Sequence, residues 1–292
     1  MLIDTHTHIH ESDFPLRSDV EIKGVLRRAA QEGVKRMMLV GTSLRSSEEA
    51  ELFIKKWRDF ATKLGIKFVM AAGIHPHFAD PELKIDLIKE VKKLDNFIAR
   101  VIRKNDVHLA SIGEIGLDFF YDFSFRKRQI ELFKLQLELA RKFSLPINFH
   151  IRDFKKPAGE NSVWLDFWNV MRDQRFADFG YKIPLMFHSY TEQSRDNLAK
   201  ILSLQNVHFG VNGISTFAKI KEQDLWRDIP LNKMVLETDA PFLAPSGFRG
   251  QTNEPARVME IAQNLAKLRN VSLTQIEQVT TTNAEHILNF WR

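Results

Sequence analysis

Two histidines near the start of the chain could share a metal ion. His6 and His8 stand two residues apart, directly after the short apolar run Met1–Asp4. Side chains two apart on a β-strand point to the same face, so both imidazoles could reach one cation. Two histidines that only form hydrogen bonds at a strand end would have the same spacing. The pair alone therefore leaves a metal site and a structural role equally open.

Further residues of ligand type follow other apolar runs. His75 and Glu114 each come after one; a buried carboxylate such as Glu114 needs a partner, which a metal, a helix cap or an ion pair could supply. His150 and His188 also end apolar runs, where a lone histidine is often a hydrogen-bonded core residue. Asp239 could bind a metal and act as a general base, or it could cap the following turn.

The apolar runs have the length and the β-branched and aromatic content of buried parallel strands. We predict strands at Met1–Asp4, Met37–Val40, Phe68–Gly73, Leu109–Gly113, Pro146–Phe149, Ile183–Phe187, Val207–Gly210 and Met234–Glu237. Amphipathic segments separate these runs. Eight strands alternating with helices in 292 residues predict an α/β fold, a TIM-type (β/α)₈ barrel, with residues 1–292 as a single domain. The sequence has no Gly-x-Gly-x-x-Gly and no Walker motif, which disfavours a nucleotide-binding sheet.

The helical segments show apolar positions at helical spacing. The second is predicted to begin at the capping box formed by Ser46 and Glu49 and to stop at Gly65. After the fourth strand, Phe133 and Leu137 continue the same kind of pattern.

A parallel barrel brings the carboxyl ends of all its strands to one rim, where the active sites of this fold lie. The ligand-type residues would therefore converge there, although they are far apart in the sequence. Imidazoles and carboxylates suit Zn²⁺, Mn²⁺ or Mg²⁺, and the chain has no cysteine. Two such cations, roughly 3.5–4 Å apart, would polarise a phosphoryl oxygen and lower the pKa of water. The predicted ligands are His6, His8, Glu114, His150, His188 and Asp239.

Composition adds little to this prediction. The net charge of +5 mildly favours an anionic partner such as nucleic acid. No apolar run is long enough to span a bilayer, and the start of the chain lacks the features of a signal peptide. We therefore expect a cytoplasmic protein with no membrane contact and no obligate protein partner.

The order of these motifs resembles the TatD family of metal-dependent deoxyribonucleases, within the wider amidohydrolase-like barrel superfamily. The resemblance runs from Met1 to the C-terminus. It rests on Ile3-Asp4-Thr5-His6-Thr7-His8, Gly73-Ile74-His75-Pro76-His77, Gly113-Glu114-Ile115-Gly116-Leu117-Asp118, Pro146-Ile147-Asn148-Phe149-His150-Ile151-Arg152 and, most specifically, Glu237-Thr238-Asp239-Ala240-Pro241.

The resemblance implies an activity and a division of roles. The expected activity is phosphodiester hydrolysis of DNA, as an exonuclease on single strands or 3′ ends. Glu114 would bridge two divalent cations, with Asp239 taking the proton from the attacking water, and these two are the implied catalytic residues. His75 and Arg152 would contact substrate phosphate. The first cation would be held by His6, His8, Glu114 and Asp239, and the second by Glu114, His150 and His188.

Some positions depart from the family pattern and bear on the choice of substrate. They are His10, Asp153-Phe154 and Ser189-Tyr190-Thr191-Glu192. The aromatic and basic residues Phe119, Phe120, Tyr121, Phe123, Phe125, Lys155 and Lys156 would suit stacked bases beside phosphates, or would simply pack loops onto the barrel. The remaining histidines, His10, His77, His108, His208 and His286, are expected to be structural or at the surface.

Two other functions remain open on the sequence. One is another metal-dependent hydrolase of the amidohydrolase superfamily, acting on a C–N bond or a phosphotriester. Such relatives often use a carboxylated lysine as the bridge, and Glu114 at that position favours the nuclease. The other is a nucleic-acid-binding barrel without catalysis, which the complete set of ligand-type residues disfavours.

Overall fold

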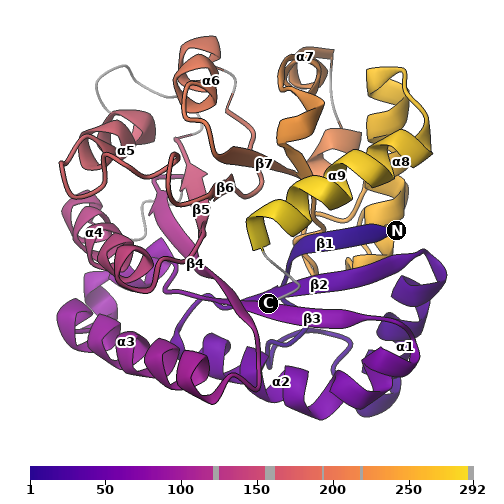
Figure 1. The fold of residues 1–292 in the computed structure, drawn as a ribbon, viewed down its shortest axis with the longest axis horizontal. Coiled ribbons are helices and arrows are strands. Elements are labelled where there is room, and N and C mark those ends of the chain that lie inside the picture. Colours follow the sequence, from indigo (N-terminus) through magenta and orange to yellow (C-terminus); the bar gives the residue numbers. More distant parts are fainter. Residues whose placement is uncertain (121–124, 155–161, 193, 218–219, 289–292) are drawn as a thin grey trace.

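Eight parallel strands form one sheet in which each strand pairs with its neighbours in the sequence (Figure 1). The structure, a computed structural model, describes residues 1–120, 125–154, 162–192, 194–217 and 220–288. The strands are β1 (Leu2–Thr7), β2 (Val34–Val40), β3 (Lys67–Ala72), β4 (Leu109–Asp118), β5 (Ile147–Arg152), β6 (Leu185–Phe187), β7 (Val207–Val211) and β8 (Met234–Leu236). The predicted TIM-type (β/α)₈ barrel is confirmed.

Helices follow the strands and surround them (Figure 1). They are α1 (Asp19–Gln31), α2 (Leu44–Lys63), α3 (Leu87–Lys104), α4 (Arg126–Phe143), α5 (Val163–Met171), α6 (Arg195–Leu202), α7 (Ile220–Asp228), α8 (Val258–Arg269) and α9 (Leu273–Leu288). Among the described residues, none of these helices is long and apolar enough to cross a membrane.

The barrel closes where the chain beyond β8 meets β1. Thr7 pairs with Ala240 in a parallel bridge, and the Asp239 N–H donates to the His6 carbonyl over 2.9 Å. Inside this seam the buried Asp4 carboxylate accepts bonds from the N–H and the hydroxyl of Thr238, at 2.9 and 2.6 Å. Closure therefore brings the first and last candidate ligands in the sequence together.

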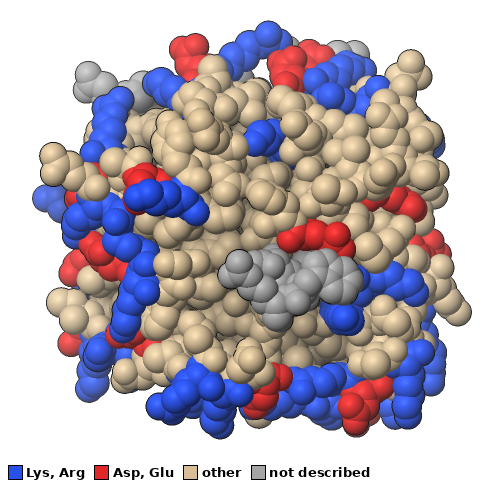
Figure 2. Space-filling view, viewed as in Figure 1, with Lys and Arg blue, Asp and Glu red and all other residues tan. Residues whose placement is uncertain are grey.

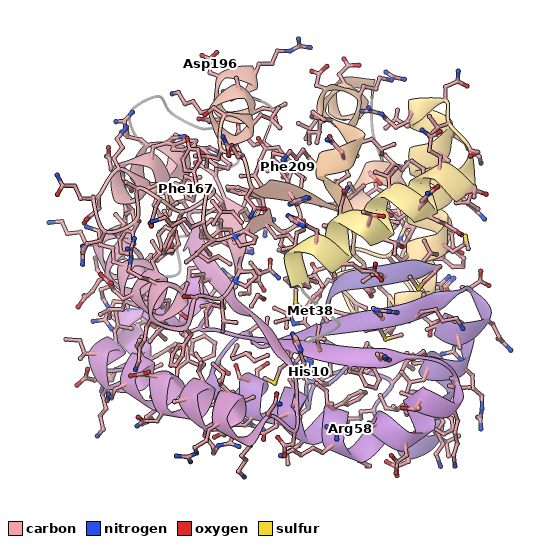
Figure 3. The ribbon with its side chains drawn as sticks, in the orientation of Figure 1. His10, Met38, Arg58, Phe167, Asp196 and Phe209 are labelled. Atoms are coloured by element: carbon pink, nitrogen blue, oxygen red, sulfur yellow. The ribbon has the colours of Figure 1, made fainter. Side chains whose placement is uncertain are left out.

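Successive side chains of a strand alternate between two cores. On β2, Met37 and Leu39 pack outward against the helices, whereas Met38 and Val40 point into the barrel. In Figure 3, Met38 lies near the centre of the molecule, and Phe167 lies in the surrounding layer. The inner core is small and is completed by residues of α9: Ala284, Ile287 and Leu288.

Helix α9 closes the end of the barrel at which the strands begin. It crosses in front of the strands in Figure 1, and the Thr281 hydroxyl donates to the Met1 carbonyl at the start of β1 over 2.8 Å. On this face the visible Lys and Arg side chains lie mostly around the margin (Figure 2). The open rim, where the strands end, is at the opposite end of the barrel.

The structure corrects the predicted boundaries. Helix α2 does not begin at a capping box of Ser46 and Glu49: its N-cap is Ser43, whose hydroxyl accepts from the Ser46 N–H over 3.1 Å. The Ser46 hydroxyl instead donates to Glu11. Strands β1 and β4 extend beyond their apolar runs into polar residues that are buried at the rim, and β5 extends to the partly buried Arg152.

Candidate metal centre

Glu114 lies at the middle of the rim, and its two oxygens face different histidines. It is within β4 and only 4% exposed. Oε2 lies 3.5 Å from His6 Nε2 and 3.9 Å from His8 Nε2. Oε1 lies 2.6 Å from His150 Nδ1 and 3.6 Å from His188 Nε2. One carboxylate thus separates two groups of candidate ligands.

The first group has the spacing of a coordination shell. His6 Nε2 lies 3.1 Å from His8 Nε2, and His8 Nε2 lies 3.3 Å from Asp239 Oδ1. Two atoms bound to one cation at ~2.1 Å lie about 3.0–3.4 Å apart. His6, His8 and Glu114 form a group whose ligand atoms all lie within 4.8 Å of one another. These side chains fit a divalent cation.

The second group lies on the other side of the Glu114 carboxylate. His150 and His188 face Oε1, and their rings are nearly parallel, with centroids 6.0 Å apart. The His188 ring also stacks on His6, with centroids 3.6 Å apart, so the two groups share one compact cluster. His75 lies close to this group, and His75, Glu114 and His150 could also hold an ion.

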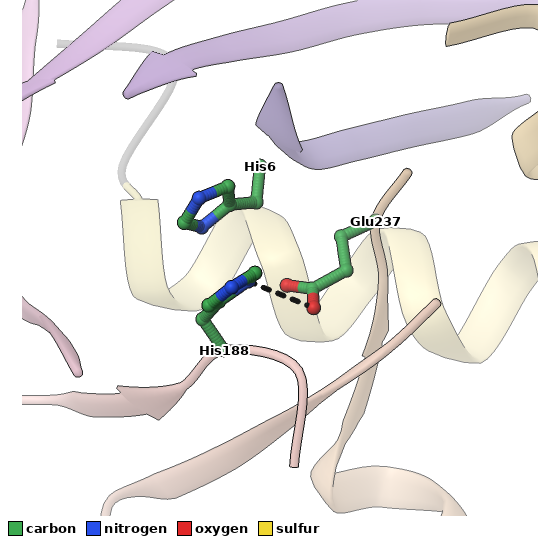
Figure 4. A group of neighbouring side chains, drawn as sticks. All are labelled: His6, His188 and Glu237. Atoms are coloured by element: carbon green, nitrogen blue, oxygen red, sulfur yellow. Dashed lines mark ion pairs between the residues drawn. The ribbon is translucent and has the colours of Figure 1, made fainter. Parts of the chain in front are cut away.

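The atoms behind the His8 and His188 rings decide which of their nitrogens can bind a cation. His8 Nδ1 lies 2.8 Å from the Val40 carbonyl oxygen, which can only accept. His188 Nδ1 forms an ion pair with Glu237 Oε1 at 3.1 Å (Figure 4). When either ring is neutral, as cation binding requires, its proton belongs on Nδ1 and Nε2 keeps its lone pair toward Glu114.

His150 has the opposite orientation. Its Nε2 lies 3.0 Å from Asp118 Oδ2, so its Nδ1 carries the lone pair toward Glu114. Asp118 is only 1% exposed and is held in place by Gln129, which accepts from its backbone N–H and donates to its carbonyl.

The orientation of His6 depends on an amide. The Asn148 Nδ2 atom lies 3.0 Å from His6 Nδ1, and Asn148 Oδ1 has no hydrogen-bond partner among the described residues. A half-turn of the amide would present Oδ1 to Nδ1 instead. That arrangement would place the proton on Nδ1 and leave Nε2 available to a cation.

His75 differs from the candidate ligands in the nitrogen that it turns toward Glu114, which is the protonated one. The His77 backbone N–H donates to His75 Nδ1 over 3.2 Å, so a neutral His75 ring carries its proton on Nε2. Burial, together with nearby His150, holds the pKa of His75 well below its usual value, so the ring stays neutral. His75 Nε2 points toward Glu114 from 3.9 Å as a donor. A donor at this position favours contact with an anionic substrate over metal binding.

Two histidines that the sequence predicts to be structural or at the surface also lie at this rim. His77 Nε2 lies 3.0 Å from Asp118 Oδ2, and His75, His77 and Asp118 together form a group that could hold an ion. His10 is buried, with Nε2 3.2 Å from the Ser46 hydroxyl. Of the others, His208 is buried, and its ring lies 6.3 Å from that of His286, on α9.

Ionisation of the site reflects how closely its charges are packed. Burial by itself would raise the pKa of Glu114, but His188 and His150 outweigh it and hold this pKa well below its usual value. Burial lowers the pKa of His150, yet Asp118 and Glu114 outweigh burial and raise this pKa to about 10. Burial also lowers the pKa of His8, and Asp239 is the chief group that raises it to about 9. Cations bind neutral imidazoles, so binding would displace these protons.

Arg152 ends β5, two residues beyond His150. Its guanidinium carbon lies 3.7 Å from the centre of the Phe120 ring. Phe119 is buried and packs against Phe154, which supports the packing interpretation for that residue. The predicted contacts of Tyr121, Phe123, Lys155 and Lys156 lie outside the described residues.

The residues that depart from the family pattern form contacts with neighbouring segments of the chain. Asp153 accepts from the Ser162 hydroxyl and the Val163 N–H and thereby holds the start of α5. Ser189 adopts a left-handed φ of 47°, and its N–H donates to Glu237 over 2.6 Å. Tyr190 is buried against Phe209, with ring centroids 4.7 Å apart.

The sequence interpretation did not identify the residues that orient the candidate ligands. Asn148 and Glu237 stand two residues before a candidate ligand, and Asp118 stands four after Glu114 on the same strand. For Asn148 and Asp118 this even spacing on a strand was an available signal, because it puts side chains on one face. Glu237 lies beyond the end of β8 at Leu236, where the rule does not apply. The glycine at position 210 leaves room for the Glu237 side chain, since a Cβ there would collide with the Glu237 carboxylate.

Known proteins resemble this chain in sequence and in architecture. A metal-dependent hydrolase of Bacillus subtilis, YabD, is 30% identical over 98% of each chain. The Escherichia coli metal-dependent hydrolase YcfH is 28% identical over 97% of this chain and 93% of its own. The solved structure of the TatD homologue YjjV from E. coli superposes with a TM-score of 0.76 and 25% identity, covering 99% of this chain and 98% of the other.

The family assignment rests on nearly the whole chain. The family model described as TatD related DNase matches residues 3–289, a span that contains every candidate ligand. Together with the relatives above, this match shows that the chain is a metal-dependent hydrolase and a member of the TatD-related DNase family.

Proposed function

We propose that this protein is a deoxyribonuclease that hydrolyses phosphodiester bonds at the ends of single-stranded DNA, using two divalent cations. The observation that carries the proposal is the position of Glu114, whose two oxygens face separate pairs of histidines. Beside this carboxylate stands a ring, His75, that is held as a donor. A donor at this position would pair with an anionic phosphate oxygen, a group that a neutral amide lacks.

The cations would polarise the phosphoryl oxygen and lower the pKa of the attacking water. His6, His8, Glu114 and Asp239 would hold one of them, and Glu114, His150 and His188 the other. His75 Nε2–H would donate to a phosphate oxygen, and Arg152 would pair with the phosphate from the end of β5. Asp239 Oδ1 would accept the proton of the attacking water. These roles supply positioning and charge compensation around the scissile bond.

Three substrates test the proposal on one preparation of the metal-loaded protein. These are a single-stranded oligonucleotide, bis(p-nitrophenyl) phosphate and a set of simple amides. We expect the first two to be hydrolysed, activity to disappear with EDTA, and Mg²⁺ or Mn²⁺ to restore it. Hydrolysis of amides only would indicate the C–N hydrolase. DNA binding without any hydrolysis would indicate a binding barrel, and full activity after exhaustive chelation would exclude the two-cation mechanism.

A further inference from the structure

One large apolar side chain is exposed directly beside the candidate metal centre. Phe242 is 55% exposed, although it stands only three residues after Asp239. Its ring lies 6.3 Å from the His8 ring, edge to face at 62°. Scattered exposed apolar residues are ordinary on protein surfaces. This one touches a candidate ligand, which the other exposed apolar residues are not shown to do.

The backbone around Phe242 is held rigidly. The Phe242 N–H donates to the Asp239 carbonyl over 2.8 Å. The fully buried Asn253 amide donates to the carbonyls of Phe242 and Thr238, at 2.6 and 2.8 Å. The exposed ring therefore stands on a fixed support, which limits the entropy lost when a partner packs against it.

The segment also contains unfavourable backbone angles. Asp239 and Leu243 have left-handed φ values of 57° and 54°, which non-glycine residues seldom adopt. Such strain persists only where surrounding contacts enforce it, and it concentrates at functional sites. The backbone conformation here turns the Asp239 side chain toward the candidate histidine ligands, while Phe242 remains exposed.

The same segment also carries an exposed arginine, Arg249, that could pair with a phosphate. The Ser246 N–H donates to the Thr216 hydroxyl over 2.8 Å, which ties the segment after β8 to the one after β7. The exposed Arg249 then lies over the Phe217 ring, its guanidinium carbon 4.9 Å from the ring centre. In this fold the loops after the seventh and eighth strands often bind phosphate.

We infer that Phe242 is a stacking platform for an unpaired nucleobase of the substrate, adjoining the scissile phosphate. This inference rests on the proposed function and specifies its substrate. An internal base of a duplex has both faces covered by its neighbours, whereas an unpaired base can turn a face to the ring, so the platform favours a single-stranded end. Aromatic stacking is tolerant of sequence, because every base has a π face.

The test compares Phe242→Leu, which keeps an apolar side chain but removes the π face, with Phe242→Trp, which retains it. The matched control is Tyr181→Leu, because Tyr181 is 49% exposed and precedes β6, away from the rim. Kinetics are measured on a single-stranded oligonucleotide, the same strand with an abasic terminal nucleotide, and bis(p-nitrophenyl) phosphate. A 2-aminopurine at the terminal position reports stacking by fluorescence quenching.

We expect Phe242→Leu to raise KM for the intact oligonucleotide by about 5- to 150-fold, the range that loss of one base stack causes. The Phe242→Leu variant should no longer quench the 2-aminopurine fluorescence. The Phe242→Trp variant should keep the wild-type KM and the quenching. Hydrolysis of the abasic strand should change little, because its terminal nucleotide has no base to stack. Tyr181→Leu should match the wild type throughout.

The outcomes separate the two proposals. If the wild type cleaves the oligonucleotide and Phe242→Leu cleaves it equally well, the platform is excluded while the nuclease proposal stands. An equal loss on the abasic strand would also overturn the platform, because no base is then involved. If the wild type hydrolyses bis(p-nitrophenyl) phosphate but no DNA, the proposed function itself fails.

Discussion

Imidazoles at the rim are distinguished by the groups behind them. The Val40 carbonyl behind His8 and the carboxylate of Asp118 behind His150 each require a ring N–H, which leaves the other nitrogen facing Glu114. The backbone N–H behind His75 requires a lone pair instead. Histidines a few ångströms apart therefore differ in what they present to Glu114: His8 and His150 present a lone pair, and His75 presents an N–H.

Asp118→Asn tests this orientation. The amide can turn its NH₂ group to His150 Nε2, which would move the ring proton to Nδ1 and point it at Glu114. We expect the affinity for the second cation to fall about 10- to 100-fold, with the first cation nearly unaffected. Calorimetric metal titration measures both sites, and ¹⁵N NMR of the imidazole reports the tautomer.

Asp153→Asn is the matched control, because Asp153 bonds to Ser162 and Val163 at the start of α5. It should leave metal binding unchanged. Equal affinities in the Asp118 variant and the wild type would show that Asp118 does not orient His150.

Asp239→Asn separates two proposed roles of one side chain. The amide oxygen can still coordinate a cation, but it cannot accept a proton. We expect much of the metal to remain and turnover to fall roughly 10²–10⁴-fold, the usual cost of losing a general base. Metal content and turnover are measured on one preparation. A metal-loaded variant with near wild-type turnover would place the base elsewhere.

Helices α2 and α3 are joined by ion pairs around one buried carboxylate. Glu51 is 4% exposed and accepts from both guanidinium NH groups of Arg100, at 2.8 and 2.6 Å, and from Lys55 at 2.7 Å. The bond to Arg100 is the chief reason that the pKa of Glu51 is lowered to about 2 from 4.5. Removing one partner would leave the guanidinium of Arg100 without its main counter-charge.

Glu51→Gln should therefore lower the free energy of unfolding near pH 7 by about 2–3 kcal/mol. A carboxyl with a depressed folded pKa stabilises the fold above its unfolded pKa, and this contribution is lost as the pH falls through the folded value. The difference between wild type and variant should shrink between about pH 4.5 and pH 2. Urea unfolding across this range measures it. A difference that stays constant with pH would contradict the charge-based explanation.

At the scale of the whole molecule, the candidate metal centre joins distant parts of the chain. Its side chains come from β1, β4, β5, the segment after β6 and the segment after β8. A cation bound only by the folded chain stabilises it by mass action, by about 2.7 kcal/mol at 100 times its dissociation constant. We expect Mn²⁺ to raise the melting temperature of the wild type by several degrees and EDTA to reverse the rise.

Glu114→Ala should abolish this stabilisation, because Glu114 would help to hold both cations. Glu138→Ala, which alters only a surface ion pair with Arg175, should keep it. Differential scanning calorimetry with and without Mn²⁺ compares the variants. An undiminished shift in the Glu114 variant, with two ions still bound by metal analysis, would show that Glu114 is not the bridge.

The sequence alone determined the types and order of the candidate ligands and the alternation of strands and helices. Local patterns carry this information, because apolar runs and helical spacing reflect which face of each element is buried. The position of each ligand-type residue after an apolar run, together with the barrel, predicted a common rim. Local patterns were less reliable for element ends: the apparent capping box at Ser46 gave way to Ser43, since the Ser46 hydroxyl bonds to Glu11, 35 residues away.

Only the tertiary structure decided which atom of each ligand faces which neighbour. Barrel closure placed Asp239 against His8, and strand pairing put the Val40 carbonyl behind that ring. These contacts join residues more than 30 positions apart in the sequence. A ring's tautomer follows from its hydrogen-bond partner, and that partner is supplied by another strand. The physical reason is that spacing along one strand specifies a face, whereas a coordination shell requires several strands in register.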